Sequence, residues 1–236
     1  MNSLYRAPEV RAETTAPALE FADVFRIYRS GDVETVALRG LSLRVERGDV
    51  VAVFGPSGSG KSTFLHLAAG LDVPSAGDVR ALGRSLSRLD DEELAAHRAR
   101  DVAIVFQADN LWPALTACEN VESALRLAAV PDAAGRARSA LAAMGIAARA
   151  EHRAAELSGG EQQRVAIAAA AARRAAVVLA DEPTGELDIA SERLVLDALL
   201  RLRDEYESTV VIVTHSPRVA EAVDRVIEIR DGRALA

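Results

Sequence analysis

The chain reads Asp49-Val50-Val51-Ala52-Val53-Phe54-Gly55-Pro56-Ser57-Gly58-Ser59-Gly60-Lys61-Ser62-Thr63 at the stretch that decides its fold. The part through Phe54 is apolar and rich in β-branched residues, which predicts a buried strand. Phe64 to Ala69 are good helix formers, and no breaker comes before Gly70, which predicts a helix. A strand, a glycine-rich turn and a helix form the context that a phosphate-binding loop requires.

The chemistry of this loop is specific. Gly55, Gly58 and Gly60 permit backbone conformations that side chains forbid, so successive amide N–H groups can point inward as an anion nest. The helix adds the positive end of its dipole. Lys61, the only lysine of the chain, is expected to reach the β- and γ-phosphates, and the Ser62 hydroxyl to bind Mg²⁺. The alternative, a flexible turn with an incidental lysine, is disfavoured by the flanking strand and helix.

Composition narrows the possible functions. The chain has 236 residues, half of them hydrophobic, which is enough for a sizeable core. Its formal net charge of -7 argues against a nucleic-acid binder, which usually carries a basic face. Cys118 is the only cysteine, so no disulfide can form within the chain. No apolar run approaches the roughly 18 residues of a membrane span, so a membrane role would come through a partner.

The residues before the loop predict an arm and a small sheet. Residues 1–17 lack periodicity and are expected to be a disordered arm. Residues 19–28 and 41–46 alternate apolar and polar side chains, which predicts half-buried antiparallel strands. Tyr28 ends the first of them. Its ring could stack on a nucleotide base or could cap the edge of the small sheet.

Three later apolar runs, 102–106, 176–182 and 209–213, are expected to be buried strands that each end in polar side chains. The carboxyl ends of such strands are where ligand sites form in α/β folds. The polar side chains are Gln107 after the first run, Asp181 and Glu182 at the end of the second, and His215 after the third.

Each of these polar residues has a possible role. Asp181 is expected to hold Mg²⁺, and Glu182, on the opposite face, to act on the attacking water. Gln107 could bind Mg²⁺, hold a water or make a simple loop hydrogen bond. His215 could bond a γ-phosphate or cap the helix that begins after it.

The segment 111–155 interrupts the α/β pattern and is called the helical insert below. It carries predicted helices at 116–129 and 132–144 and no strand signal. Its Trp112, the only tryptophan, could pack in the core of the insert or be an exposed anchor for a partner. After the insert, Ser158 can cap a helix that continues to residue 174. Gly159 and Gly160 at that helix start expose N–H groups, a second anion-binding end or an ordinary N-cap.

This ordered set of motifs closely resembles the nucleotide-binding subunit of an ATP-binding-cassette (ABC) transporter, from about residue 18 to the end. Gly55 to Thr63 match the family's Walker A motif, Val177 to Glu182 its Walker B motif, Leu157 to Gln163 its signature motif, Gln107 its Q-loop, Gly185 to Asp188 its D-loop, His215 its H-loop and Tyr28 its adenine-stacking aromatic. The signature motif separates ABC proteins from other phosphate-loop ATPases. The resemblance therefore favours the functional interpretation of the residues left open above.

The resemblance implies an α/β fold: a phosphate-loop (RecA-like) core with a small antiparallel β-subdomain and an inserted α-helical subdomain at about 108–160. Residues 18–236 would then form a single ABC ATPase domain. It also implies an ATPase that uses ATP and Mg²⁺ as a head-to-tail homodimer, in which the signature motif of one copy closes over ATP on the other.

Site residues follow from the same resemblance. Glu182 would polarise water, while His215 and Lys61 would stabilise charge on the transferred phosphoryl group. The implied metal ligands are Ser62, Gln107 and Asp181. The implied nucleotide-binding residues are Tyr28, Gly55, Pro56, Ser57, Gly58, Ser59, Gly60, Lys61, Ser62, Thr63, Gln107, Ser158, Gly159, Gly160, Glu161 and His215.

The resemblance further implies an integral membrane permease as partner, a place on the cytoplasmic face of the plasma membrane, and no nucleic acid. Segments such as 70–72, 115–121 and 180–185 look like the lipoprotein-release and macrolide-export branch of the family. The chain also departs from the family pattern. Ala169 replaces an arginine of the signature helix, Ala175 a proline before the Walker B strand, and Glu186 an asparagine.

Three alternatives remain. A non-transport ABC ATPase, which transmits force to an extracytoplasmic cell-wall or division enzyme, would share every catalytic residue. ABC ATPases of DNA repair or translation usually carry two cassettes, coiled coils or basic inserts, unlike this acidic single cassette. A nucleotide-binding scaffold without turnover would not need Glu182 and His215.

Overall fold

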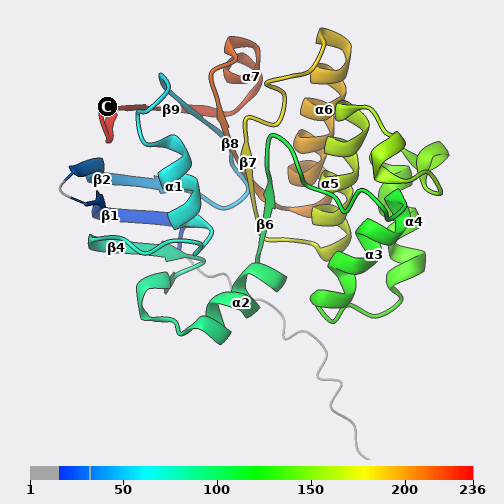
Figure 1. Ribbon diagram of the computed structural model, residues 1–236, viewed down its shortest axis with the longest axis horizontal. Coiled ribbons are helices and arrows are strands. Elements are labelled where there is room, and N and C mark those ends of the chain that lie inside the picture. Colours follow the sequence, from blue (N-terminus) through cyan, green and yellow to red (C-terminus); the bar gives the residue numbers. More distant parts are fainter. Residues whose placement is uncertain (1–15, 32, 236) are drawn as a thin grey trace, which may run out of the picture.

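A six-stranded sheet, ordered β10-β9-β3-β8-β7-β6, runs through the part of the chain that the computed structural model describes, residues 16–31 and 33–235 (Figure 1). The same described residues form a four-stranded antiparallel sheet, ordered β2-β1-β4-β5. This sheet lies on one side of the six-stranded sheet, and helices α3 to α6 lie on the other. Most of the predicted arm, residues 1–15, falls outside the described residues.

The strands of the central sheet are β3 (Val50–Phe54), β6 (Val102–Val105), β7 (Val177–Asp181), β8 (Thr209–Thr214), β9 (Arg225–Arg230) and β10 (Arg233–Leu235). Those of the outer sheet are β1 (Leu19–Ser30), β2 (Val33–Val45), β4 (Ala76–Ala81) and β5 (Arg84–Ser85). The α-helices are α1 (Lys61–Ala68), α2 (Asp91–Arg100), α3 (Ala117–Leu127), α4 (Ala133–Ala143), α5 (Gly159–Arg173), α6 (Ile189–Tyr206) and α7 (Pro217–Ala222). Short 3₁₀ helices span Leu86–Arg88, Ala147–Arg149 and Ala154–Glu156.

The four predicted buried strands, together with β9, form the parallel part of the central sheet. β3 pairs with β8 and β9, and β7 pairs with β6 and β8. Parallel strands are buried on both faces, which explains why these segments read as continuous apolar runs. Because β3, β7 and β8 are neighbours that point the same way, their carboxyl ends bring the phosphate loop, Asp181 and His215 to one edge.

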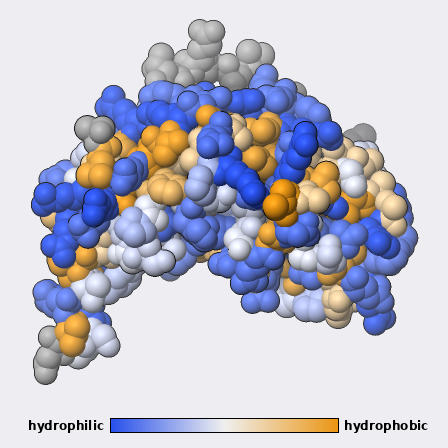
Figure 2. Space-filling model, turned by 90° about the horizontal axis from the view of Figure 1, so that it is seen from above, coloured by the Kyte–Doolittle hydropathy of each residue, from blue (hydrophilic) through white to orange (hydrophobic). Residues whose placement is uncertain are grey.

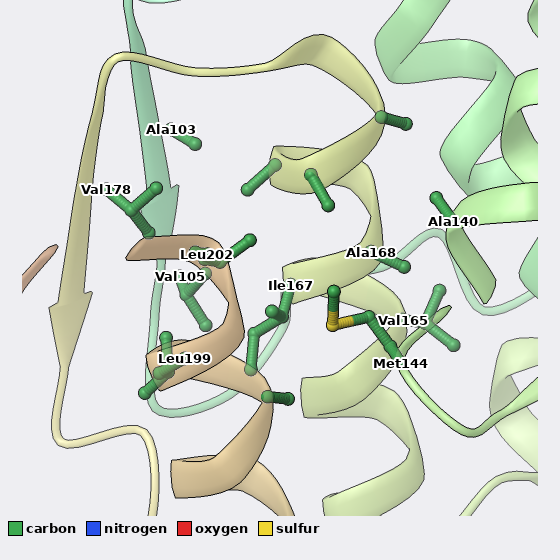
Figure 3. Close-up of a cluster of buried hydrophobic side chains, with 14 of the residues drawn as sticks. Ala103, Val105, Ala140, Met144, Val165, Ile167, Ala168, Val178, Leu199 and Leu202 are labelled. Atoms are coloured by element: carbon green, nitrogen blue, oxygen red, sulfur yellow. The ribbon is translucent and has the colours of Figure 1, made fainter. Parts of the chain in front are cut away.

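Side chains of the central strands alternate between two buried clusters, as the period of a strand requires. Val178 and Val210 belong to the cluster under α5 and α6, whereas their neighbours Leu179 and Val211 belong to the cluster under α1 and the outer sheet. Figure 3 shows the first cluster, where the valines and leucines of β6, β7 and α6 meet α5. The alanines of α5 allow close packing on both of its sides.

The outer sheet corrects one predicted boundary. The second antiparallel strand was expected to begin at residue 41, but β2 begins at Val33. The reason is that β1 extends to Ser30 and pairs along its whole length, with Tyr28 opposite Thr35. The short strand β10 was not predicted, because three residues carry no clear alternation; it pairs antiparallel with β9.

The helical insert contains α3 and α4, each within two residues of its predicted bounds. Thr116 caps α3 in a capping box with Glu119. Trp112 is 70% exposed, so of the two alternatives, packing in the core of the insert is wrong. No helix among the described residues is long and apolar enough to cross a membrane.

The face seen from above is hollowed between the lobe that carries the outer sheet and the helical lobe (Figure 2). Apolar atoms on this face form separate patches among hydrophilic ones rather than one continuous surface.

Candidate active site

The phosphate loop opens into a cavity of about 440 Å³ at the carboxyl edge of the central sheet. Its lining residues come from β1, β2, the loop with α1, and the ends of β7 and β8: Tyr28, Thr35, Val36, Ala37, Ser57, Gly58, Gly60, Lys61, Ser62, Thr63, Asp181, Glu182 and Val213. The three residues of β2 were not predicted, although the pairing of β2 with the strand of Tyr28 could have indicated them. The cavity thus joins segments that are far apart in the sequence.

Glycine is required in this loop for two different reasons. Gly60 has a φ of +103°, and a Cβ on it would lie 2.6 Å from the carbonyl oxygen of Ala37. Gly55 does not have a positive φ, contrary to the prediction that all three glycines supply unusual backbone angles. A Cβ on Gly55 would instead overlap the carbonyl oxygen of Ile229, so close approach of two backbones excludes a side chain.

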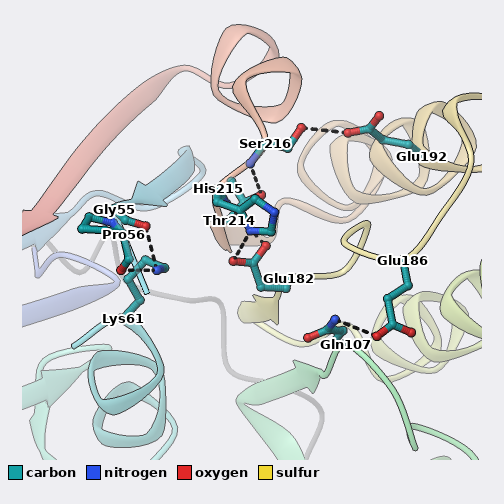
Figure 4. Close-up of polar contacts among 10 residues, drawn as sticks. All are labelled: Gly55, Pro56, Lys61, Gln107, Glu182, Glu186, Glu192, Thr214, His215 and Ser216. Atoms are coloured by element: carbon teal, nitrogen blue, oxygen red, sulfur yellow. Dashed lines mark hydrogen bonds and ion pairs between the residues drawn. The ribbon is translucent and has the colours of Figure 1, made fainter. Parts of the chain in front are cut away.

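Helix α1 begins at Lys61 and leaves its first amides free for an anion. Gly60 provides no side-chain cap, and the first turn has no acidic residue. Lys61 is 9% exposed, and its Nζ donates to the carbonyl oxygens of Gly55 at 2.8 Å and Pro56 at 3.0 Å (Figure 4). Its ammonium group is thereby held over the loop that it is expected to serve.

Asp181 and Ser62 are hydrogen-bonded to each other and could provide two oxygen ligands. Burial raises the pKa of Asp181, the charge of Glu182 raises it further, and a hydrogen bond with Ser62 opposes both. The charges of His66 and Lys61 also lower this pKa but do not offset burial, so the half-buried carboxylate suits a divalent cation. Among the described residues no cluster of three or more His, Cys, Asp or Glu could hold a metal alone. The pair therefore fits Mg²⁺, which usually takes few protein ligands and completes its shell with phosphates and water.

Glu182 and His215 lie against each other at the ends of β7 and β8. His215 Nδ1 lies 2.9 Å from Glu182 Oε1, and the His215 amide donates to Oε2 at 3.4 Å (Figure 4). Glu182 has a φ of +45°, a left-handed conformation that a side-chain-bearing residue rarely adopts. The structure thus joins the two residues that were predicted to act on water and on the γ-phosphate.

Tyr28 is held by a pair of residues that sequence reasoning missed. Its hydroxyl donates to Asp72 Oδ2 at 2.9 Å and lies 3.5 Å from Thr63 Oγ1. The Arg26 guanidinium stacks over the ring, 4.6 Å from its centroid, and pairs with Asp72 at 2.7 Å. No sequence signal indicates this contact, because it depends on the loop after α1 folding back onto β1.

A second cavity, of about 230 Å³, holds the Q-loop and the signature helix. It is lined by Gln107, Ala108, Asp109, Asn110, Gly159, Gln162, Gln163, Pro183, Gly185, Glu186 and Leu187. Gln107 Nε2 donates to Glu186 Oε1 at 3.2 Å (Figure 4). The two cavities share no lining residue. The signature motif and the phosphate loop of one chain therefore line different cavities, and the Gln107 side chain is bonded to Glu186.

The signature residues form the predicted helix cap. Ser158 Oγ accepts from the Glu161 amide at 3.3 Å, and Glu161 Oε2 accepts from the Ser158 amide at 2.8 Å. The bond from the Ser158 backbone lowers the pKa of Glu161, and Arg149, which donates to its Oε1, lowers it further. A Cβ on Gly160 would lie 3.0 Å from Cβ of Ser191, so α5 and α6 can pack this closely only with glycine there.

Gln163 is a positioning residue that the sequence named only as part of a motif. It is 4% exposed, and its Nε2 donates to the carbonyl oxygens of Phe106 at 2.9 Å and Gln107 at 2.7 Å. Its Oε1 accepts from Asn110 at 3.2 Å. All three bonds go to the Q-loop segment, so the start of α5 and this loop are bonded together.

Comparison with known proteins places these features in a family. Residues 38–185 match the family model described as "ABC transporter". The chain is 43% identical over 220 residues to the lipoprotein-releasing system ATP-binding protein of Geobacter metallireducens, which covers 92% of this chain and 98% of that protein. It is 43% identical over 223 residues to a macrolide export ATP-binding/permease protein of Brucella melitensis. That match covers 94% of this chain but 34% of the relative, so the chain spans about a third of the macrolide export protein.

A solved structure agrees in fold. An ATP-binding cassette, described as a dimer in a post-hydrolysis state bound to ADP and Pi, superposes with a TM-score of 0.85 at 38% sequence identity. The match covers 92% of this chain and 97% of that one. The fold expected from the motifs, an ABC ATPase cassette, is confirmed.

Proposed function

Because this chain belongs to the ABC transporter family, as an ATPase subunit of the lipoprotein-release and macrolide-export type, we propose that two copies associate head to tail around two ATP molecules and drive a membrane permease. Each ATP lies on the phosphate loop of one copy and is closed over by Ser158, Gly159, Gly160 and Glu161 of the other. ATP binding draws the copies together, and hydrolysis lets them separate.

The observation that carries this proposal is the separation of the two cavities. The phosphate loop with Asp181 and Glu182 lines one, and Gly159 with Gln107 lines the other. The N-terminus of α1 has no side-chain cap, and that of α5 begins with two glycines after the Ser158 cap. Helix N-termini can bind phosphate, yet within one chain these two line different cavities. A second copy supplies the missing half of each site.

Hydrolysis then follows from the residues at the sheet edge. Lys61 and the first amides of α1 bind the phosphates, and Glu182 accepts a proton from the attacking water. His215 holds the Glu182 carboxylate in place and stabilises charge on the transferred phosphoryl group. Ser62 and Asp181 would hold Mg²⁺, which neutralises phosphate charge when bound, and Gln107 is a further proposed ligand.

The partner is proposed to be an integral membrane permease, with the chain on the cytoplasmic face of the plasma membrane. The exposed Trp112 and the Q-loop at the root of the helical insert offer the docking region for a cytoplasmic helix of that permease. The named relatives, a lipoprotein-releasing ATP-binding protein and a macrolide export protein, support a permease of that kind. The acidic net charge of -7 agrees with a function without nucleic acid.

Complementation between two inactive variants tests the head-to-tail arrangement. Lys61→Ala weakens nucleotide capture on its own loop, and Ser158→Arg blocks the cap that a copy offers to its partner. Each variant alone is expected to be inactive. In a mixture, one site of each heterodimer combines an intact loop with an intact cap, so phosphate release is expected to return.

The matched control mixes Lys61→Ala with a second loop variant, Lys61→Met, which gives no intact site and no recovery. If the Lys61→Ala and Ser158→Arg mixture stays as inactive as this control while the variants form mixed dimers, the shared-site proposal is wrong.

A further inference from the structure

Arg173, at the last position of α5, caps a different helix. Its Nη1 donates to the carbonyl oxygens of Arg98 at 3.2 Å and Ala99 at 3.1 Å. These carbonyls lie in the last turn of α2, where a helix lacks internal partners and carries the negative end of its dipole. Burial lowers the pKa of Arg173, so the guanidinium accepts a desolvation cost to make these bonds.

Arg98 repeats the same contact one helix further on. Its Nη1 donates to the carbonyl oxygen of Gly70 at 2.7 Å. Gly70 lies in the turn after α1, one residue beyond the C-cap Ala69, and adopts a φ of +63°, with the Leu71 amide bonded back to the carbonyl of His66 at 2.9 Å. Arg98 therefore holds the C-terminal end of α1, as Arg173 holds that of α2.

The two arginines join three helices end to end. α5 contacts α2 through Arg173, and α2 contacts α1 through Arg98. Figure 1 shows α2 at the lower part of the molecule, below β6 and between the other two helices. The opposite ends of α1 and α5 carry the phosphate loop and the signature motif. α5 has 15 residues and is therefore about 22 Å long, so the connection lies a full helix length away from the signature motif.

We propose that Arg98 and Arg173 are positioning residues that couple the phosphate loop to the signature motif of the same chain through α2. The inference rests on the proposed function, because in a head-to-tail dimer these two ends serve different ATP molecules. A shift of α1 on binding one ATP is transmitted through the two arginine caps to α5, which closes the other site. Charge-assisted hydrogen bonds are roughly twice as strong as neutral ones, and both arginines make them to backbone carbonyls at the end of a helix or in the turn after it.

The chain's departure from the family pattern agrees with this role. Ala169 stands where the signature helix usually has arginine, and Arg173 lies four residues later on the same helix face. The nearby Arg100 differs from Arg98 and Arg173, which are called the relay arginines below. It lies in the last turn of α2, is exposed, and makes no hydrogen bond or ion pair within the part of the chain that the structure describes.

The test measures ATP hydrolysis against ATP concentration for Arg98→Met, Arg173→Met and the double variant, with Arg100→Met as matched control. Each relay variant is expected to lower kcat by about fivefold, the lower end of measured couplings between sites, while KM changes less. The Hill coefficient for ATP is expected to fall toward unity. Because the arginines act in series, the double variant is expected to be no worse than either single one.

Melting temperatures of the single and double variants distinguish the proposed coupling role of Arg98 and Arg173 from a purely structural role. Structural losses from the two distant contacts would add in the double variant and leave the Hill coefficient unchanged, and that result would overturn the proposal. Arg173→Lys, which can still donate to both carbonyls, is expected to restore most of the cooperativity. If Arg173→Met does not fold, Arg98→Met and Arg98→Lys make the same comparison.

Measurements on the wild-type chain distinguish failure of the proposed dimer from failure of the proposed coupling through Arg98 and Arg173. A wild type without cooperativity, whose activity per chain does not change on dilution, would remove the proposed dimer and the relay with it. A cooperative wild type whose Arg98→Met and Arg173→Met variants stay equally cooperative would overturn the relay alone.

Discussion

Glu182 shows how one residue joins backbone strain to chemistry. A left-handed backbone costs a residue with a side chain about 1–2 kcal/mol. The conformation is fixed by the Glu182 amide, which donates to Val213, and by the Glu182 carbonyl, which accepts from Gly185. The turn that results places the carboxylate against His215. Strain of this kind is commonly found where a side chain must be aimed.

Glu182→Gln is expected to keep this geometry and lose the base. A positioned general base is worth roughly 10²–10⁴-fold, so ATP hydrolysis should fall by that range while ATP still binds. Size-exclusion chromatography with ATP and Mg²⁺ should then show trapped dimers. Normal turnover by this variant would exclude Glu182 as the base.

Asp181 provides a prediction about pH. Because burial raises the pKa of Asp181 in the folded chain, ionisation destabilises the fold when no cation is present. Asp181→Asn, measured with a chelator and without nucleotide, should therefore raise the melting temperature near neutral pH. Below the ordinary aspartate pKa of about 3.9 the folded and unfolded states are both protonated, so the pH-dependent part of the difference should be absent there. It should grow as pH rises from that value to the raised pKa of the folded chain and stay constant above it.

Ser62 is left unchanged in this comparison. Asp197→Asn, on the exposed face of α6, is the control for loss of one negative charge. An Asp181→Asn difference that is constant at every pH would contradict the assignment. The same variant should also lose ATPase activity, because it removes the proposed metal ligand.

At the residue scale, motif chemistry could be predicted and local contacts could not. Lys61 was predicted from the loop, and Asp181 and Glu182 were predicted from the end of one strand. The contacts of Tyr28 with Arg26 and Asp72, and the bonds from Gln163 to the Q-loop, depend on segments that meet only after folding.

Helix α5 connects several parts of the molecule. Its start is bonded to the Q-loop, its middle packs between the central sheet and the helical insert (Figure 3), and its end caps α2. The glycine at its second position allows α6 to approach, since a Cβ on Gly160 would lie 3.0 Å from Cβ of Ser191.

Gly160→Ala is expected to destabilise the chain by overpacking, which costs about 1–3 kcal/mol. For a chain of this size, that corresponds to a loss of about 2–4 °C in melting temperature per kcal/mol. Gly159→Ala is the matched comparison, because its Cβ would meet only the flexible end of Leu187, at 3.3 Å. Equal melting temperatures for the two variants would show that α6 yields to the added methyl group.

Among the elements, those with a strong apolar signal were predicted well. β3, β7 and β8 are buried on both faces, and α3 and α5 have clear caps. The start of β2 and the strand β10 were missed because their pairing partners, not their own residues, define them.

At the scale of the whole molecule, the fold places two half-sites on one chain. Sequence predicted this through the order of the motifs, and the two separate cavities agree with it. The lobes on either side of the hollow in Figure 2 carry the outer sheet and the helices, so in the proposed dimer a second copy would meet both.

Activity per chain is therefore expected to depend on protein concentration. Below the dissociation constant of the dimer, the rate of phosphate release per chain should fall in proportion to the fraction of dimer. Enzyme dilution at saturating ATP and Mg²⁺ measures this directly, with a genetically linked pair of cassettes as the control that dilution does not separate. A constant rate per chain at every dilution would contradict the two-copy site.

Trp112 is an intrinsic fluorescence probe of the helical insert. Since it is the only tryptophan of the chain and its indole is 70% exposed, long-wavelength ultraviolet excitation addresses one fluorophore in one lobe. Iodide should quench its emission freely in the isolated chain. Shielding from iodide, together with a blue shift, would then report the arrival of a permease helix in real time and without any attached dye.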